Sequence, residues 1–182
     1  MDFSKNKYAF EIVKSKFFEN IENINQLIYK INKGYNFNNR GIEGTKGDIF
    51  EIFCEAYLKT NPEYQIKNVY PQGYVPSNLR KKLKLSYQDR GYDGVYETND
   101  GEFSTYQSKF RSNDEQLTWQ GKNGLSSFIG VSEKAHTRHL IATTNKVSKE
   151  FLSKSRIQLT LLSDLRKLNK NDFDRISNFL NK

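Results

Sequence analysis

The sequence predicts an α/β protein in which a mixed central sheet carries helices on both faces. Helical and strand-like apolar patterns alternate along the 182 residues in the order helix, strand, strand, strand, helix, strand, helix, strand. Two of the strands, 91–96 and 102–111, follow each other across the turn Asn99-Asp100-Gly101, as in a β-hairpin. Such a mixture is typical of a layered α/β domain. The length suits a single domain with a substantial core.

The first part of the chain is predicted to be helical. Apolar side chains recur at helical spacing at Phe10, Val13, Phe17, Ile21, Ile24, Leu27, Ile28 and Ile31. The pattern predicts two amphipathic helices that end near Gly34. We expect residues 1–42 to form an N-terminal helical appendage and residues 43–182 to form the main domain.

The clearest helix of the sequence spans residues 45–60. An apolar stripe that includes Ile49, Phe50 and Phe53 predicts its buried side. Glu51 and Glu55 lie one turn apart on another face, and Asn61-Pro62 ends the helix. A carboxylate on such a helix is either a surface charge or part of a site, and Glu51 is the better candidate for the site.

The remaining elements alternate between strands and helices. Residues 64–70 predict a short strand, and residues 77–85 predict a short basic helix or turn. After the hairpin come a helix at 124–135, a buried strand at 139–144, a helix at 147–155, a strand at 158–162, a helix that begins at 163, and an amphipathic helix at 172–180.

Charge and composition narrow the class of partner. The formal net charge is +8, from 29 Lys and Arg against 21 Asp and Glu, which favours nucleic acid as a partner unless the lysines are merely a solvated surface. The single Cys54 excludes an intramolecular disulfide and a zinc site built from cysteines. No apolar run approaches the roughly 20 residues of a membrane span, so we expect no membrane partner and an intracellular protein, in the cytoplasm of a prokaryote or of a virus-infected cell.

The hairpin holds the strongest candidate site. Gln107 and Lys109 are two residues apart on the second arm, so their side chains share a face while Ser108 points the opposite way. Placed beside Asp93 of the first arm, they would bring together a carboxylate, an amide oxygen and an ammonium. Such a group can hold a hard divalent cation and a phosphate, which indicates a nuclease centre.

Basic residues cluster just before Asp93. Their number and their proximity in sequence favour contact with nucleic-acid phosphates over a merely solvated face. The candidates for this contact are Arg80, Lys81, Lys82, Lys84 and Arg90, together with Arg111 at the end of the hairpin. His136 and His139 have no cysteine or second carboxylate pair nearby in sequence, so we interpret them as solvated or capping residues.

The hairpin motif resembles the signature of the PD-(D/E)XK nucleases. Asp93 followed by Gln107-Ser108-Lys109 is similar to the Gln-x-Lys form of Mrr-like restriction endonucleases, and Gly47 to Glu51 resembles the first-helix motif of this family. The strand and helix from His139 to Val147 resemble the later part of its core. The stretch from Leu117 to Ser132 resembles nuclease domains fused to DEAD/DEAH-type helicases. The resemblance covers roughly residues 43–168.

The resemblance implies a restriction-endonuclease-like three-layer sandwich and a Mg²⁺-dependent endonuclease acting on DNA, with Mn²⁺ as a substitute metal. Asp93, Gln107, Lys109 and Glu51 are the expected catalytic residues, and Asp93, Gln107, Ser108 and Glu51 the expected metal ligands. Gln107 offers a neutral oxygen, so Glu51 would restore the missing negative charge. Lys109 would orient the attacking water or stabilise charge on the phosphate.

Two other functions remain open on the sequence alone. The glutamine at an otherwise acidic position is compatible with a catalytically inactive DNA-binding module of the same fold. A protein-interaction domain of a larger helicase or restriction system is the second alternative, and in that case the N-terminal helices would matter most. The oligomeric state, a dimer included, is also left open.

Overall fold

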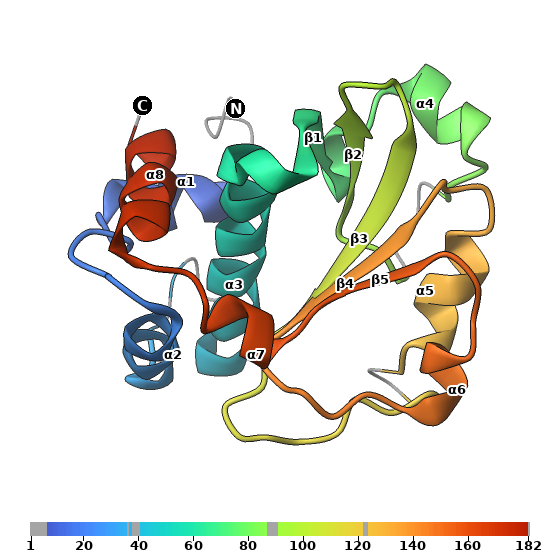
Figure 1. Cartoon of the computed structure of the whole chain (residues 1–182). Helices are drawn as coiled ribbons and strands as arrows, with labels where there is room; N and C mark the ends of the chain where they lie inside the picture. The colour runs from blue at the N-terminus through green and yellow to red at the C-terminus, as the bar shows by residue number, and fades with distance from the viewer. Residues whose placement is uncertain (1–6, 36, 38–40, 87–90, 122–123, 182) are drawn as a thin grey trace.

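A five-stranded mixed sheet forms the centre of the protein, here a computed structural model that describes residues 7–35, 37, 41–86, 91–121 and 124–181. The strands are β1 (Ile66–Pro71), β2 (Gly94–Thr98), β3 (Phe103–Lys109), β4 (Arg138–Ala142) and β5 (Ile157–Thr160), and they lie side by side in chain order. β1, β2 and β3 pair antiparallel, whereas β3, β4 and β5 pair parallel (Figure 1). The predicted hairpin is therefore confirmed as β2–β3.

Helices cover both faces of this sheet (Figure 1). On one face, buried side chains join four helices into one core: α1 (Lys7–Lys14), α2 (Ile24–Asn32), α3 (Gly41–Thr60) and α8 (Lys170–Leu180). The other face carries a second core beneath α4 (Ser77–Lys82), α5 (Ser126–Val131) and α6 (Lys149–Leu152). The short helices η2 (Pro62–Tyr64), η3 (Gln72–Tyr74) and α7 (Leu162–Leu165) connect these elements. The expected three-layer α/β arrangement is confirmed.

Helix α3 is the central helix of the molecule. Every residue from Ile52 to Leu58 is buried, because the sheet packs on one side of the helix while α1, α2 and α8 pack on the other. Its apolar composition is therefore nearly continuous instead of forming one stripe. Burial all round has a consequence for function, since it places the carboxylate of Glu55 in the interior.

The N-terminal helices share their core with the rest of the chain. Ile12, Leu27 and Ile31 are fully buried in the same cluster as Phe53 of α3 and Phe173 of α8. Packing is thus continuous across residue 42, the expected boundary between the appendage and the main domain. Among the described residues, no helix combines the length and the apolar character that crossing a bilayer requires.

Candidate active site on the β2–β3 hairpin

The candidate site lies where β2 and β3 separate. The backbone N–H of Asp93 donates to the carbonyl of Tyr106, the last such bond on this side of the hairpin ladder. The next N–H of β3, that of Ser108, donates instead to Oδ2 of the Asp93 carboxylate at 2.6 Å, and the Ser108 hydroxyl donates to the same oxygen at 2.6 Å. The side chain of Asp93 therefore replaces a ladder carbonyl and is held close to the plane of the sheet.

The two faces of β3 carry different groups. Gln107 and Lys109 lie beside Leu140 and Ala142 of β4, which belong to the core under α4, α5 and α6. Residues in register on neighbouring strands share a face, so Gln107 and Lys109 lie on this side of the sheet. Ser108 lies beside Ile141, which belongs to the core under α3. The alternation predicted from the sequence is confirmed.

One part of the predicted geometry needs correction. Strand alternation predicts that Asp93 shares a face with Gln107 and Lys109, away from Ser108. The carboxylate is in fact bound by both the N–H and the hydroxyl of Ser108, because β2 leaves the ladder at this residue. Asp93 consequently lies between the two faces of the sheet instead of on one of them.

The amide of Gln107 has an unsatisfied oxygen. The side chain is buried, with 3% of its surface exposed, and its Oε1 atom has no hydrogen-bond partner among the described residues. A buried carbonyl oxygen without a donor costs about 1–3 kcal/mol, so such atoms are uncommon unless a ligand satisfies them. Mg²⁺ takes oxygen ligands of this kind. Gln107, next to Ser108 along β3, and Asp93, which Ser108 holds, therefore supply oxygen ligands of the kind that a hard divalent cation takes.

Helix α3 presents two glutamates towards this end of the hairpin. Glu55 is buried, and its pKa is raised to about 8, first by desolvation and then by the negative charge of Asp93. Glu51, one turn earlier, is half-buried. Both act electrostatically on the phenol of Tyr106, Glu55 more strongly than Glu51. Asp93 and Glu51 thus exert negative charge at this end of the hairpin, whereas Glu55, with its raised pKa, is mostly protonated at neutral pH.

The sequence analysis preferred Glu51 to Glu55 and did not predict that Glu55 is buried. On an exposed helix face Glu55 would be an ordinary surface charge, and the sequence does not show that other helices cover this face. The unbroken apolar run around Glu55, from Ile52 to Leu58, was the available signal, since it indicates a helix buried all round. Whether Glu51 or Glu55 completes a metal site stays a prediction.

Two glycines allow the strands to approach closely around Asp93. A Cβ atom on Gly94 would lie 2.4–2.5 Å from the ring of Tyr106, so this ring packs directly over the glycine. Gly91 has a φ of +118°, and a Cβ there would lie 2.8 Å from the backbone of Ser127 at α5. The Gly91-Tyr92-Asp93-Gly94 segment therefore fits tightly between β3 and α5, and a side chain at Gly94 or Gly91 would force Tyr106 or the backbone of α5 to shift.

The predicted phosphate-binding residues do not form one cluster. Arg80 is buried and structural, because its guanidinium donates to the Ser86 carbonyl at 3.0 Å, the Tyr92 hydroxyl at 3.1 Å and the Gln72 carbonyl at 2.8 Å. These bonds fasten α4 to the start of β2. The expectation that Arg80 is an exposed contact for phosphates is wrong. An arginine of a short amphipathic helix can be exposed or buried, and the sequence alone does not distinguish the two.

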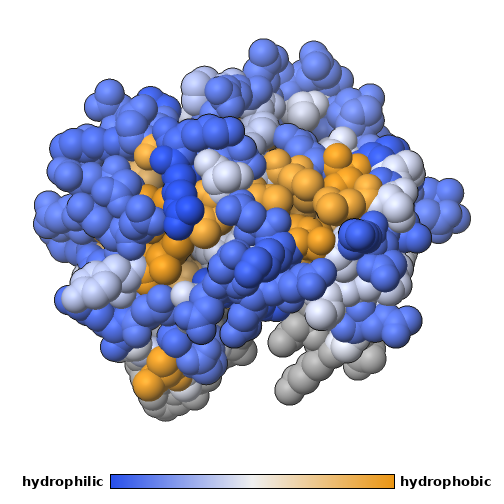
Figure 2. Space-filling view, turned by 60° about the horizontal axis from the view of Figure 1, so that its bottom comes forward, coloured by the Kyte–Doolittle hydropathy of each residue, from blue (hydrophilic) through white to orange (hydrophobic). Residues whose placement is uncertain are grey.

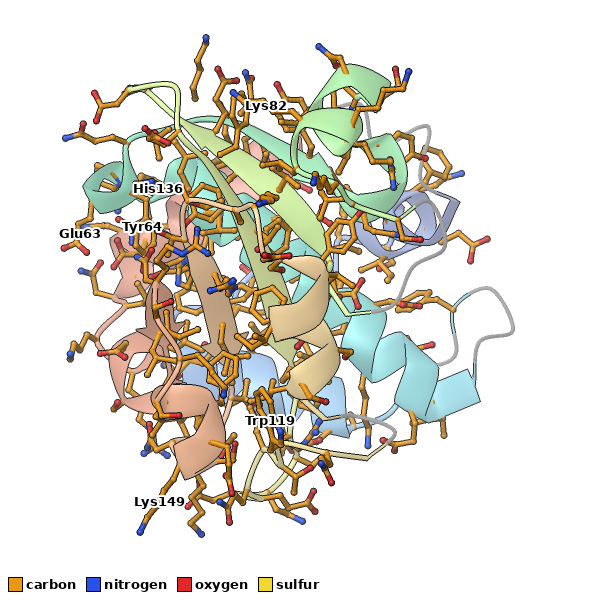
Figure 3. All side chains as sticks on the ribbon, turned by 90° about the vertical axis from the view of Figure 1, so that its right-hand side faces the viewer. Glu63, Tyr64, Lys82, Trp119, His136 and Lys149 are labelled. Carbon is orange, nitrogen blue, oxygen red and sulfur yellow. The ribbon has the colours of Figure 1, made fainter. Side chains whose placement is uncertain are left out.

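Of the exposed lysines of this region, Lys82 lies towards the far end of the hairpin. Lys81, Lys82 and Lys84 are exposed, and the ammonium of Lys82 lies 4.6 Å from the centre of the Phe103 ring, where β3 begins (Figure 3). Six residues of strand, about 20 Å, separate Phe103 from Lys109. Proximity in sequence to Asp93 therefore overestimated proximity in space. Arg90 lies outside the described residues.

Arg111 lies closer to the candidate site than these lysines. It follows Lys109 by two residues and is half-buried; its N–H donates to the Thr143 hydroxyl at 2.7 Å. Its side chain lines a polar pocket of about 450 Å³ at the end of β3. This position keeps Arg111 as a candidate for phosphate contact.

The two histidines have different environments, and neither supports a metal site. His136 is exposed, 3.3 Å from the carboxylate of Glu102. His139 is completely buried, so the expectation of a solvated or capping residue is wrong for it. Its Nε2 shares a hydrogen bond of 2.8 Å with the Thr160 hydroxyl, which also pairs with the Tyr64 hydroxyl at 2.9 Å. Burial lowers the pKa of His139 to about 3, so it is neutral.

No group of three or more His, Cys, Asp or Glu side chains within the described ranges is arranged to hold a metal ion. A site at the hairpin would therefore combine carboxylates with the amide oxygen of Gln107 and with backbone carbonyls, as Mg²⁺ sites commonly do, with water completing the coordination.

Comparison with known proteins agrees with this arrangement. Residues 59–177, more than half of the chain, match a family model described as restriction endonuclease, of the Mrr catalytic type. The match includes the whole hairpin but begins after Glu51 and Glu55. No curated protein matches the chain.

A solved structure gives an independent comparison of the fold. The ATP-dependent Type ISP restriction-modification enzyme LlaBIII, bound to DNA, is similar with a TM-score of 0.54 and 23% sequence identity. The similarity covers 81% of this chain but 9% of that much longer chain. At this identity the likeness concerns the fold, and the fold agrees with the family match. The chain thus belongs to the Mrr-type restriction endonuclease family.

Proposed function

We propose that this domain is a metal-dependent endonuclease that hydrolyses phosphodiester bonds of DNA. Asp93, Gln107 and Lys109 form its proposed centre, assisted by a carboxylate of α3. The observation that carries the proposal is the pairing of a fixed carboxylate with an unsatisfied oxygen: Ser108 holds Asp93 in place, and the adjacent Gln107 buries an amide oxygen that no described residue satisfies. Membership of a restriction endonuclease family supports a nuclease role.

Each residue has a defined part in the proposed reaction. Asp93 and Gln107 would hold Mg²⁺ or Mn²⁺, with the Ser108 carbonyl and Glu51 as further ligands. The bound metal supplies a more acidic water and neutralises charge on the phosphate. Lys109 lies on the same face as Gln107, where its ammonium would orient the attacking water or stabilise negative charge on the phosphate. The two hydrogen bonds from Ser108 hold Asp93 in position during this step.

The biological setting is also part of the proposal. LlaBIII is described as an ATP-dependent restriction-modification enzyme and as bound to DNA. By analogy, we propose that this domain acts on DNA alongside a helicase or another component of a restriction complex, whether fused or separate. The excess positive charge of the chain is compatible with this partner.

A catalytically inactive DNA-binding module is the second candidate. It is favoured by the neutral glutamine at an acidic position of the family signature and by the lack of a three-acid metal group within the described ranges. Both features would weaken metal binding.

One experiment separates these candidates. Plasmid and single-stranded DNA are incubated with the chain in Mg²⁺, Mn²⁺ or EDTA, beside the variants Asp93→Asn and Lys109→Met. Cleavage that requires the metal and both residues would support the endonuclease. DNA binding without cleavage under every metal condition would support the inactive module.

A further inference from the structure

A polar pocket adjoins the proposed catalytic centre. It encloses about 450 Å³ at the end of β3, and its lining begins with Phe110 and Arg111, the first two residues after Lys109. The first turn of α3 contributes Glu43 to the lining. Figure 2 brings this lower end of the molecule towards the viewer and shows a largely hydrophilic surface with separate hydrophobic areas. The volume suits one small organic group.

The lining combines the chemistry that recognises an unpaired base. Phe110 offers an aromatic ring that packs against Phe50, with ring centres 5.9 Å apart. Arg111 offers a guanidinium. Amide, hydroxyl and carboxylate groups come from Gln116, Gln120, Ser112, Thr118 and Glu115. Stacking on aromatic or guanidinium groups, with hydrogen bonds to the base edges, is how proteins bind bases outside a duplex.

The pocket carries little net charge, which favours a base over a second phosphate. Glu43 pairs with Lys46 at 2.7 Å, so its charge is balanced. Arg111 and Glu115 supply one charge of each sign among the remaining lining residues. A dedicated phosphate site would show an excess of positive donors instead.

The walls of the pocket are held by hydrogen bonds outside it. The Ser112 hydroxyl donates to Asn32 of α2 at 2.8 Å, and Asp114 accepts from the Thr144 hydroxyl at 2.9 Å. Further along the loop, the N–H of Leu117 donates to the Lys146 carbonyl at 2.8 Å. Both sides of the loop are thus anchored to α2 and to the end of β4, so the pocket is formed before any ligand binds.

We propose that this pocket receives one unpaired nucleobase of the DNA strand beside the scissile phosphate. The proposal rests on the nuclease function proposed above and deepens it by naming a substrate class: DNA with a single-stranded or displaced nucleotide at the cut. Lys109 and Arg111 are about 7 Å apart along an extended chain, so the base would be a close neighbour of the phosphate at Lys109. A base within an intact duplex is stacked and paired, and would have to leave the helix to enter.

Binding tests the pocket independently of cleavage. A single-stranded oligonucleotide that carries the fluorescent base 2-aminopurine is titrated with the chain in EDTA. Gln116→Trp fills the pocket, and Asn178→Trp, at an exposed position of α8, is the matched control. Thermal melts check that both variants fold. Because a base excluded from the pocket loses its stacking on Phe110 or Arg111, we expect roughly tenfold weaker binding and loss of the fluorescence change in Gln116→Trp, with the control unchanged. Equal binding and fluorescence in all three proteins would overturn the proposal.

Cleavage provides the second readout. With Mg²⁺, the wild-type chain should cut a duplex with one unpaired nucleotide about tenfold faster than the matched duplex, and Gln116→Trp should lose this preference. Equal rates on both duplexes would contradict the pocket while leaving the nuclease intact. A chain that binds 2-aminopurine through the pocket but cuts no DNA would instead refute the nuclease function.

Discussion

Two buried polar clusters lie in the same sheet, yet their chemistry differs. At the hairpin, burial and the nearby Asp93 carboxylate raise the pKa of Glu55, and the amide oxygen of Gln107, on the neighbouring strand β3, has no partner among the described residues. Across β4 and β5, His139 and Tyr64 both pair with the Thr160 hydroxyl, and the lowered pKa of His139 keeps its imidazole neutral at neutral pH. Burial of polar groups is common to both clusters. Each cluster contains an unsatisfied buried atom among the described residues, Oε1 of Gln107 and Nδ1 of His139, so it is the carboxylate of Asp93 that distinguishes the candidate site.

The largest difference between the clusters should appear in cleavage. We expect Asp93→Asn and Lys109→Met each to lower the cleavage rate by at least about 10²-fold, because the first weakens the proposed metal ligand and the second removes the ammonium that would stabilise the reacting phosphate. His139→Gln should leave the rate within about twofold once the protein is folded. Rates are measured on plasmid DNA with Mg²⁺, and circular dichroism checks the fold. Equal losses in the Asp93 and His139 variants would remove the distinction.

The pH dependence of stability should have opposite signs in the two clusters. The pKa of Glu55 is raised from 4.5 in the unfolded chain to about 8, so its protonated form is the one stabilised by folding. Its contribution is complete below pH 4.5 and is lost as the pH rises to 8, with a limiting slope of about 1.4 kcal/mol per pH unit. Glu55→Gln should abolish this slope in urea unfolding measured in EDTA. A slope unchanged in that variant would show that Glu55 is not protonated in the fold.

His139 should affect the stability of the fold in the acid range. Its pKa falls from 6.5 to about 3 on folding because burial disfavours the imidazolium, so folding stabilises the neutral form. Its contribution is complete above pH 6.5 and declines as the pH falls towards 3. Urea unfolding of His139→Gln should show a weaker loss of stability between pH 6.5 and pH 4 than the wild type, with Glu55→Gln as the control that retains it. Parallel acid profiles for wild type and His139→Gln would contradict the assignment.

A smaller effect, on DNA binding, is expected from the exposed lysines Lys81 and Lys84. The combined variant Lys81→Glu and Lys84→Glu should weaken DNA binding and reduce the salt slope by about 0.9 for each phosphate that is no longer neutralised, while the cleavage rate at saturating DNA stays unchanged. Lys134→Glu combined with Lys149→Glu is the control of equal charge. Binding is followed by fluorescence anisotropy across a salt series. If both double variants behave alike, Lys81 and Lys84 belong only to a solvated surface.

The sequence predicted the fold well because its signals were local. Apolar periodicity, the Asn99-Asp100-Gly101 turn and the alternation of Gln107, Ser108 and Lys109 depend on neighbouring residues, and the structure confirms the elements they indicated. The errors came from packing between distant segments. Arg80 is structural because Gln72 and Tyr92 surround it, and Glu55 is buried because other helices cover α3.

The position of Asp93 shows the same limit of prediction from local sequence patterns, here between two neighbouring strands. Strand alternation predicts faces correctly while a strand stays in its ladder, as it does for β3. It fails at the residue where β2 departs from the ladder, since the Asp93 side chain takes the place of a backbone carbonyl. Departure points of this kind depend on the tight fit of Gly91 and Gly94 against α5 and Tyr106, which no local pattern displays.

Metal titration by calorimetry, on the chain without DNA, tests the central claim most directly. If Asp93 and Gln107 hold a divalent cation, Mn²⁺ should bind the wild type, bind Gln107→Ala more weakly, and fail to bind Asp93→Asn over the same concentration range. Gln107→Glu adds a negative charge and should bind Mn²⁺ more tightly, whereas His139→Gln should match the wild type. Identical Mn²⁺ affinities in the wild type, the Asp93 variant and both Gln107 variants would contradict the assignment of this site.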